Sequence, residues 1–295
     1  MILIENDCLQ ACFTTEGAEL LSLKSRTDKR EFLWQGDPEY WHGHSPILFP
    51  ITGGLWNGEC RIEGKIFRIP KHGFVQRRVW DVIDLQTSEV TFACTTTEEE
   101  KDVFPYEYNL QIRFALEKNR VTAQFKVENL GENTMFFQIG GHPAIALPDF
   151  RKGSPADGFI QLEGKPTQLL RAGEQGCIEM TETAPARYPI PFNEEGLVPI
   201  CESTFANEAL IFDEQLSAAV VLDLQHQPLA RVTSSAPVWL FWSPQGKQSP
   251  FVCLEPWYGL PDFQGFSGDI SQRPYINSLQ SHSTWSGNYD IEVFI

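Results

Sequence analysis

Positive charge is scarce in this sequence, and long apolar runs are missing. The chain has 23 Lys and Arg residues against 39 Asp and Glu, a formal net charge of -16. A field of this sign opposes attraction to nucleic acid and to anionic membranes, although a local basic patch can still bind one phosphate. No run approaches the roughly 20 apolar residues of a membrane helix, and the N-terminus lacks the pattern of a signal peptide. We therefore expect a cytoplasmic protein with no nucleic-acid or membrane partner.

Paired cysteines and nucleotide motifs are missing as well. The seven cysteines form no C-x-x-C pair, which excludes a zinc ribbon and argues against a disulfide framework, so reduced and mostly buried thiols are expected. No glycine-rich phosphate loop, dinucleotide fingerprint or nucleophile elbow is present. His42 and His44 could face one side of an extended segment and bind a metal, but the sequence shows no third group of ligands. Nucleotide-dependent and hydrolase functions are therefore disfavoured.

The sequence also lacks helical periodicity. Short runs in which apolar and polar residues alternate are found instead. Turn residues separate these runs, as in all-β sandwiches and barrels. Lys118-Asn119 resembles a tight hairpin turn, with Phe114, Leu116, Val121, Phe125 and Val127 facing inward. The expected strands are 1–4, 9–15, 18–25, 47–52, 59–62, 65–69, 79–85, 89–97, 107–116, 120–129, 159–162, 168–170, 206–212, 218–224, 228–233, 238–242, 251–255 and 289–295. With 42% hydrophobic residues and no shift in composition, we predict a large antiparallel β-sandwich forming one domain, 1–295.

One acidic residue interrupts a run that otherwise resembles a buried strand. Glu255 follows Phe251–Leu254 and precedes Pro256, which removes a donor from the hydrogen-bonding ladder, so we expect Glu255 at the end of a strand. An ionised carboxylate at such a place costs several kcal/mol unless it is paired or used. Trp257 places a flat aromatic ring beside the acid, as in many sugar sites and also in many cores.

Two histidines next to glycines are candidate partners of this acid. His142 lies in an apolar run after Gly140-Gly141, which permits close approach of the backbone to a ligand. His72 precedes Gly73 where a strand passes into a loop. Either histidine could instead be a hydrogen-bonded structural residue. A buried glutamate with histidines and aromatic rings suits proton transfer on a polyhydroxylated ligand.

Four segments of the chain carry a resemblance when they are taken together: Ser45-Pro-Ile-Leu-Phe-Pro-Ile51, Pro70-Lys-His-Gly-Phe74, Gly140-Gly-His-Pro-Ala144 and Cys253-Leu-Glu-Pro-Trp-Tyr-Gly259. In this order they resemble the aldose 1-epimerase (galactose mutarotase-like) family, most of all its bacterial LacX-type branch. The resemblance spans nearly the whole chain. It implies a galactose mutarotase-like β-sandwich that converts sugar anomers and needs neither cofactor nor metal.

The resemblance also implies roles for individual residues. Glu255 matches the general base that takes the proton of the anomeric hydroxyl, and His142 matches the general acid that protonates the ring oxygen. His72 matches a substrate-binding histidine, and Asp213 is matched to an acid that holds a sugar hydroxyl or, alternatively, is a turn residue at a strand end. Trp257 could offer an apolar face to the sugar ring.

Two positions depart from the family pattern. After Phe-Pro-Ile the family usually has Gly-Arg, whereas this chain has Gly53-Gly54. The usual arginine after His-Gly-Phe-Ala is Gln76 here, followed by Arg77 and Arg78, so that Arg77 could take over a nearby contact or simply be solvated.

These departures leave three functions open. The first is an aldose 1-epimerase. The second is a hexose-6-phosphate 1-epimerase, for which Arg77, Arg78 and Arg151 could supply a phosphate pocket. The third is a carbohydrate-binding or sensing protein without turnover. The sequence does not choose the sugar or the oligomeric state.

Overall fold

Strands make up nearly all the regular structure of the computed structural model, which describes residues 1–214 and 216–295. Within these residues no α-helix is present, as expected from the missing helical periodicity. Five short 3₁₀ turns interrupt the strands: η1 (Trp56–Gly58), η2 (Val75–Arg77), η3 (Glu99–Asp102), η4 (Glu174–Gly176) and η5 (Ile270–Gln272).

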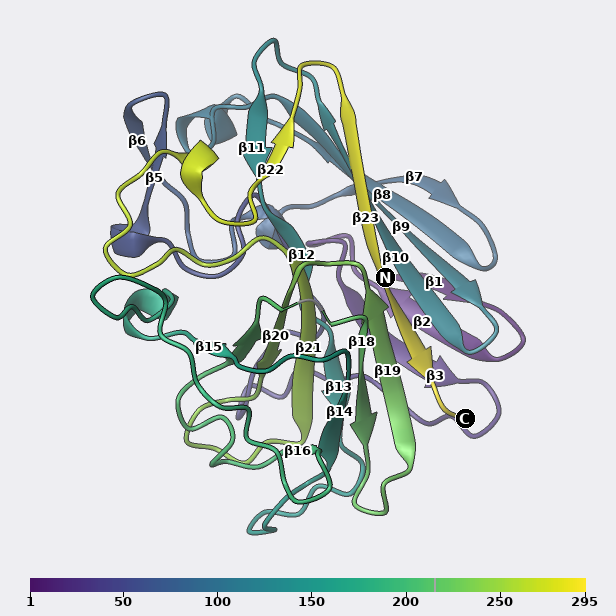
Figure 1. Ribbon diagram of the computed structural model, residues 1–295. Coiled ribbons are helices and arrows are strands. Elements are labelled where there is room, and N and C mark those ends of the chain that lie inside the picture. The colour runs from purple at the N-terminus through teal and green to yellow at the C-terminus, as the bar shows by residue number, and fades with distance from the viewer. Residues whose placement is uncertain (215) are drawn as a thin grey trace.

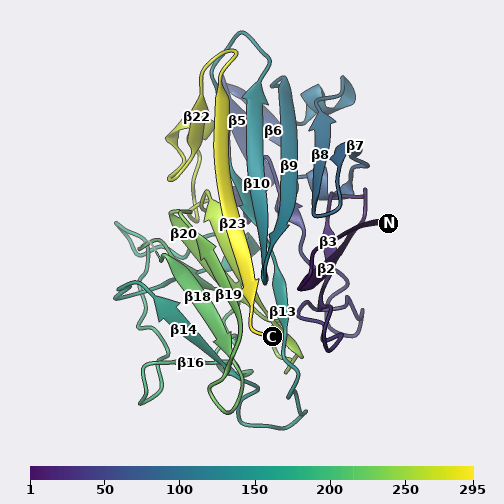
Figure 2. The same ribbon diagram turned by 90° about the vertical axis from the view of Figure 1, so that its right-hand side faces the viewer.

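The largest sheet is antiparallel and has nine strands (Figures 1 and 2). Its central pair, β9 and β10, is joined at Lys118-Asn119 as predicted, and residues of β9 alternate between buried and half-buried. In spatial order the strands are β16 (Val198–Pro199), β14 (Phe159–Glu163), β18 (Ala218–Leu222), β19 (Pro228–Ser234), β23 (Thr284–Val293), β10 (Arg120–Asn129), β9 (Tyr108–Glu117), β8 (Glu89–Thr95) and β7 (Asp81–Leu85).

A second large antiparallel sheet carries three of the four segments of the family resemblance, and the fourth, 70–74, makes only an isolated bridge from Gly73 to Phe49. Its strands in spatial order are β15 (Leu170–Arg171), β17 (Leu210–Phe212), β20 (Val238–Trp242), β21 (Phe251–Tyr258), β12 (Ile139–Gly141) and β4 (Ile47–Leu48), and β13 (Ala144–Ala146) pairs with β21 beside β12. Smaller sheets are formed by β1 (Ile2–Glu5), β2 (Leu9–Phe13) and β3 (Leu20–Ser25), by β5 (Glu59–Ile62) and β6 (Lys65–Arg68), and by β11 (Met135–Phe137) and β22 (Asn277–Leu279).

The two large sheets share one hydrophobic core. Val252 and Leu254 of β21 belong to the same buried cluster as Tyr289 and Ile291 of β23. The five residues predicted to face inward around the first hairpin are all buried, which confirms that prediction. Because residues alternate along a strand, Cys253, Glu255 and Trp257 point away from this core. The outer face of the second sheet is therefore free to carry a site.

Some predicted strands have different lengths in the structure. Segment 47–52 is a strand only at Ile47–Leu48, since Pro50 has no N–H to continue a ladder. The last strand begins at Thr284 rather than at 289. Glycine usually weakens a strand, but Gly287 lies against the rings of Trp285 and Tyr258, where a larger residue would not fit. Local composition did not reveal either effect.

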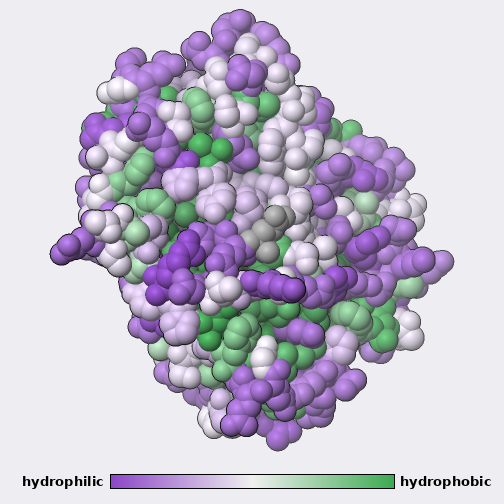
Figure 3. Space-filling view, in the orientation of Figure 1, coloured by the Kyte–Doolittle hydropathy of each residue, from purple (hydrophilic) through white to green (hydrophobic). Residues whose placement is uncertain are grey.

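Polar side chains cover most of the face seen in Figure 1, and apolar ones gather in a band below its centre (Figure 3). Among the described residues, no helix is long and apolar enough to cross a bilayer.

Candidate active site

Glu255 lies inside strand β21, not at its end, which corrects the expectation from Pro256. The pairs Gly140–Trp257 and Ala144–Cys253 share one continuous register across β12, β21 and β13. This register places His142 directly opposite Glu255. The backbone N–H of Leu254 donates to the carbonyl of Pro143 (3.1 Å), so the next ladder donor on that side would be residue 256.

Two prolines therefore flank the pair, one on each strand. Pro143 and Pro256 each remove one ladder donor, which is why β12 and β13 are separate strands and why a proline is tolerated inside β21. The backbone N–H of His142 instead bonds to the carbonyl of Pro46 (3.1 Å). His142 and Glu255 thus form a cross-strand pair without mutual backbone bonds, the arrangement in which side chains lie closest.

The two glycines before His142 are required by close packing. A Cβ atom at Gly140 would lie 2.6 Å from the ring of Trp257, and one at Gly141 would lie 2.4 Å from the ring of Tyr289. The backbone can therefore approach both rings only without side chains. As a result, Nε2 of His142 lies 3.2 Å from Oε1 of Glu255.

Aromatic rings pack against this pair and bury it. The His142 ring stacks on Trp41, with centroids 4.9 Å apart, and meets the edge of Trp242 at 5.9 Å. The exposed fraction is 8% for His142 and 0% for Glu255. Apart from the contact between Oε1 and Nε2 of His142, the carboxylate of Glu255 has no hydrogen-bond partner among the described residues, so Oε2 is available to a ligand.

Burial acts on the ionisation of both members of the pair. It raises the pKa of Glu255 well above its ordinary value, against the smaller opposite effects of the Lys71 ammonium and the Trp257 indole. Burial lowers the pKa of His142, and Lys71 acts in the same direction. Burial therefore favours a protonated acid beside a neutral imidazole. Transfer of that one proton to the imidazole gives a carboxylate and an imidazolium with no exchange with solvent.

His72 lies beside the pair with a defined orientation. Its Nδ1 accepts a hydrogen bond from the backbone N–H of Gly53 (3.1 Å), and burial lowers its pKa well below the ordinary value. The neutral ring then carries its proton on Nε2. The ring centroid lies 5.8 Å from that of His142 and 5.6 Å from that of Trp257. His72 can therefore donate to a ligand placed over the pair.

A cavity of about 780 Å³ opens above these residues. Five of the six site residues predicted from sequence line it: Glu255, His142, His72, Trp257 and Arg77. The structure does not bring Asp213 to the cavity wall. The carboxylate of Asp213 instead accepts two hydrogen bonds from Arg187, at 2.8 and 2.7 Å.

Sequence reasoning missed several further residues of the cavity, of which three bear on its chemistry. Lys71, Trp41 and Trp242 line it together with the predicted residues. Lys71 directly precedes His72 and Trp41 directly precedes His42, so proximity in sequence to candidate residues was an available signal for these two. Nothing in the local sequence of Trp242 pointed to the cavity.

The missing family arginine has a steric explanation. A Cβ atom at Gly54 would lie 2.3 Å from the backbone carbonyl oxygen of Gln175 in turn η4. The turn thus fills the space into which a side chain at this position would project. In this chain the position cannot hold an arginine without moving η4.

Gly54→Arg is therefore expected to destabilise the protein by about 1–3 kcal/mol, the usual cost of overpacking, and not to raise sugar affinity. Thermal unfolding and sugar titration of the variant measure both effects. Gly131→Arg is the matched control, because a Cβ atom there meets nothing closer than 3.5 Å. A Gly54→Arg protein as stable as wild type would contradict this explanation.

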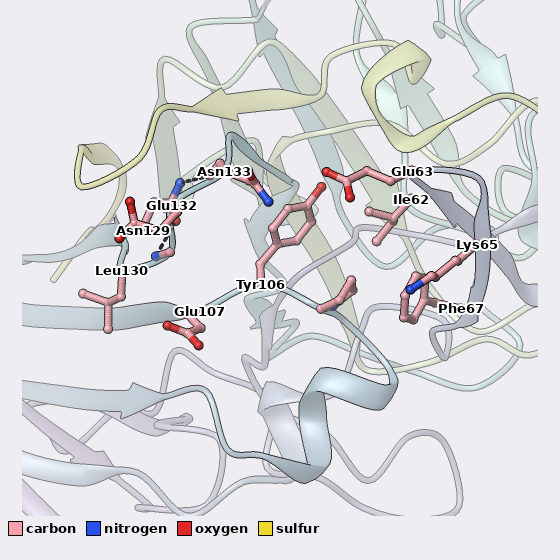
Figure 4. Close-up of a pocket in the computed structure, with 12 residues that line it drawn as sticks. Ile62, Glu63, Lys65, Phe67, Tyr106, Glu107, Asn129, Leu130, Glu132 and Asn133 are labelled. Atoms are coloured by element: carbon pink, nitrogen blue, oxygen red, sulfur yellow. Dashed lines mark hydrogen bonds between the residues drawn. The ribbon is translucent and has the colours of Figure 1, made fainter.

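A second, smaller cavity of about 310 Å³ lies beside β5 and β6 (Figure 4). Tyr106 lies among charged residues there, including Glu63, Lys65 and Glu132. None of the predicted site residues and no histidine lines it. The acid–base pair belongs to the larger cavity alone.

The structure does not support a metal site at His42 and His44. Among the described residues, the only cluster of at least three candidate ligands is His142, Cys253 and Glu255, whose ligand atoms lie within 4.8 Å of one another. His42 and His44 both line the larger cavity, but among the described residues they belong to no cluster of three candidate ligands.

Comparison with known proteins places the chain in one family. Residues 1–269 match the model of the aldose 1-epimerase family. The chain is 30% identical to the chromosomal LacX protein of Lactococcus lactis subsp. lactis, over 98% of both chains. A putative glucose-6-phosphate 1-epimerase of Escherichia coli K12 is 27% identical over 45% of this chain and 44% of that protein.

Solved structures agree with this assignment. A galactose mutarotase related enzyme from Lactobacillus acidophilus superposes with a TM-score of 0.89 and 26% identity, covering 99% of this chain and 97% of that one. The expected galactose mutarotase-like β-sandwich is thereby confirmed. The family is one of isomerases that act on sugars. This chain belongs to the aldose 1-epimerase family.

Proposed function

We propose that this protein interconverts the α and β anomers of an aldose through ring opening, with Glu255 as the base and His142 as the acid. The observation that carries the proposal is the buried cross-strand pair, with Nε2 and Oε1 3.2 Å apart at the floor of a 780 Å³ cavity. Its members could hold a carboxylate and an imidazolium at once, which is what this reaction needs.

The reaction balances within this pair. The Glu255 carboxylate takes the proton of the anomeric hydroxyl while the His142 imidazolium gives its proton to the ring oxygen, and the bond between that oxygen and C1 breaks. Rotation about the C1–C2 bond presents the other face of the aldehyde. The ring oxygen then attacks, His142 takes back its proton, and Glu255 returns the other. Each positioned group is expected to contribute about 10²- to 10⁴-fold.

The neighbouring side chains suit a sugar. Trp257 is nearly fully buried, and its indole lies near enough to Glu255 to lower the pKa of that acid but makes no hydrogen bond of normal geometry among the described residues. It can therefore donate to a hydroxyl, while its ring faces that of His72. The Nε2 proton of His72 supplies a second donor. Buried donors of this kind hold a ligand in one orientation and disfavour ligands that leave them unpaired.

The test is a panel of neutral and phosphorylated sugars in which anomer exchange is followed by NMR. Acceleration of at least one sugar above the buffer rate is expected. Saturable binding with no acceleration would instead select a carbohydrate-binding or sensing protein. If no sugar binds or exchanges faster than in buffer, the proposal is wrong.

A hexose 6-phosphate is the second candidate substrate, and two cations favour it. Lys71 and Arg77 both line the cavity, and neither side chain has an ion pair or hydrogen bond within the described residues. Of the other two arginines considered, Arg78 pairs with Glu100 (3.0 Å) and Arg151 does not line the cavity. The similarity to a putative glucose-6-phosphate 1-epimerase points the same way. Glu16, Glu19 and Glu208 also line the cavity and oppose an anion.

Lys71→Met is expected to separate these substrates. A charge-assisted hydrogen bond contributes about 1.5–3 kcal/mol, so KM for a phosphorylated sugar should rise roughly 10- to 100-fold, and more than KM for the neutral sugar. Steady-state kinetics at low and high salt measure the difference. Lys65→Met is the control, because Lys65 lines the smaller cavity. Equal changes for both sugars would exclude a phosphate contact at Lys71.

A further inference from the structure

Cys253 is the one potential metal ligand beside the proposed catalytic pair that the reaction does not use. It precedes Glu255 by two residues on β21, so both side chains project from the same face of the strand. Its exposed fraction is 0%, and it packs with Trp34, Ala144 and Phe251. Cys253, His142 and Glu255 each offer one ligand atom, and these three atoms lie within 4.8 Å of one another.

We propose that Cys253, His142 and Glu255 form a binding site for a thiophilic divalent cation, such as Zn²⁺ or Cd²⁺, that blocks the cavity floor. The carboxylate of the fully buried Glu255 contacts only Nε2 of His142, through Oε1, and neither oxygen has another hydrogen-bond partner among the described residues. Fully buried acceptors without partners are rare and call for a ligand. A sugar hydroxyl would satisfy them during the proposed reaction, and a cation would satisfy them together with the thiol.

The ligand types match the chemistry of a soft or borderline cation. A thiolate, an imidazole and a carboxylate are all zinc ligands, and three protein ligands with a fourth position open to solvent are typical of accessible zinc sites. The thiolate selects against Mg²⁺ and Ca²⁺, which prefer oxygen ligands. Two of the three ligands, His142 and Glu255, line the cavity, from which water or a sugar hydroxyl could complete the coordination.

The geometry needs only a small adjustment. Tetrahedral bonds of about 2.0–2.3 Å hold ligand atoms roughly 3.3–3.8 Å apart. The His142–Glu255 distance of 3.2 Å already approaches this range, and the full group must contract from at most 4.8 Å. That contraction is on the order of 1 Å, which rotation of the three side chains can supply.

Charge favours the site on balance. The thiolate and carboxylate together neutralise the cation, whereas the Lys71 ammonium, which also lines the cavity, opposes it. On binding, the thiol proton and the proton held by the pair leave to solvent, and no electron is transferred. The cation then occupies the two groups that the proposed reaction needs. Inhibition of anomer exchange by the cation therefore rests on the proposed function, whereas binding of the cation does not.

The test is a titration of the reduced protein with Cd²⁺ alone, followed by the ultraviolet charge-transfer band of cadmium thiolate. Wild type is expected to show a tight site that Cys253→Ala lacks. Glu255→Gln, which keeps all seven cysteines, should weaken the same site. Loss of a direct ligand should exceed the roughly 10- to 100-fold loss of affinity that follows removal of an outer-shell partner. Zn²⁺ should displace Cd²⁺ from wild type.

Cys201→Ala is the matched control, because Cys201 is half-buried and its thiol hydrogen-bonds with the hydroxyls of Ser203 and Thr204. It should bind Cd²⁺ as wild type does. Equal Cd²⁺ affinity in wild type and Glu255→Gln would overturn the site, as would an unchanged tight band in Cys253→Ala. If anomer exchange persists when Cd²⁺ saturates the tight site, the claim that the bound cation inhibits the reaction is wrong. If wild type exchanges no anomers, the proposed function fails while the Cd²⁺ titration still tests the site.

Discussion

Glu255→Gln is expected to lower kcat/KM for anomer exchange by about 10²- to 10⁴-fold, the contribution of a positioned general base. Glutamine keeps the shape of the side chain but cannot take the proton of the anomeric hydroxyl. The surrounding strand should not change, since residue 255 makes its ladder contacts through the backbone. Anomer-exchange NMR at saturating and limiting sugar measures the loss.

The same variant should be at least as stable as wild type. Burial raises the pKa of Glu255 well above its ordinary value, so at neutral pH folding must either protonate this acid or bury its charge, and a neutral amide carries neither cost. Thermal unfolding of Glu255→Gln measures its stability relative to wild type. Glu195→Gln, a change at an exposed acid, is the control. Full activity of Glu255→Gln would remove Glu255 from the mechanism. A large fall in its melting temperature would show that the acid is structural instead.

His142→Asn is expected to cause a loss of similar size, about 10²- to 10⁴-fold. Asparagine cannot give a proton to the ring oxygen, and it also gives up the stacking of the imidazole on Trp41. Sugar binding should persist, because His72 and Trp257 remain. Kinetics and equilibrium binding measured on the same preparation separate the two effects.

The double variant shows whether the two residues act as one unit. Since one proton passes between them in the proposed reaction, removing both should cost about as much as removing either, as in other coupled catalytic groups. Losses that multiply would indicate two independent contributions. A His142→Asn enzyme with wild-type kcat would exclude His142 as the acid.

The fold could be predicted because strands and turns are indicated by the residues of each short segment. Alternation along β9 and β10 follows directly from their residues, and the turn at Lys118-Asn119 is a local signal. Strand lengths at segment 47–52 and at the final strand were wrong, since they depend on what packs beside them. Gly287 looks like a strand breaker until the rings of Trp285 and Tyr258 are seen to fill its space.

The candidate site was predicted in part. The residue types of Glu255, His142 and His72, with glycine and proline around them, already indicated chemistry. Asp213 was chosen by its place in a motif, and the structure shows it bonded to Arg187. Trp242 was missed because a cavity wall is formed by residues from many segments, and the local sequence of Trp242 does not show which segments these are. Lys71 was missed although it directly precedes His72.

The sequence by itself determined an all-β chain, the family and the proposed acid and base, because periodicity, turn residues and short motifs are local properties. Only the tertiary structure decided that His142 faces Glu255 across two strands, with a proline beside each. Only the structure decided, too, that Gln175 bars a side chain at Gly54 and that Cys253 lies beside the pair. These facts are contacts between segments far apart in the chain, and packing and strand register set such contacts rather than local propensity.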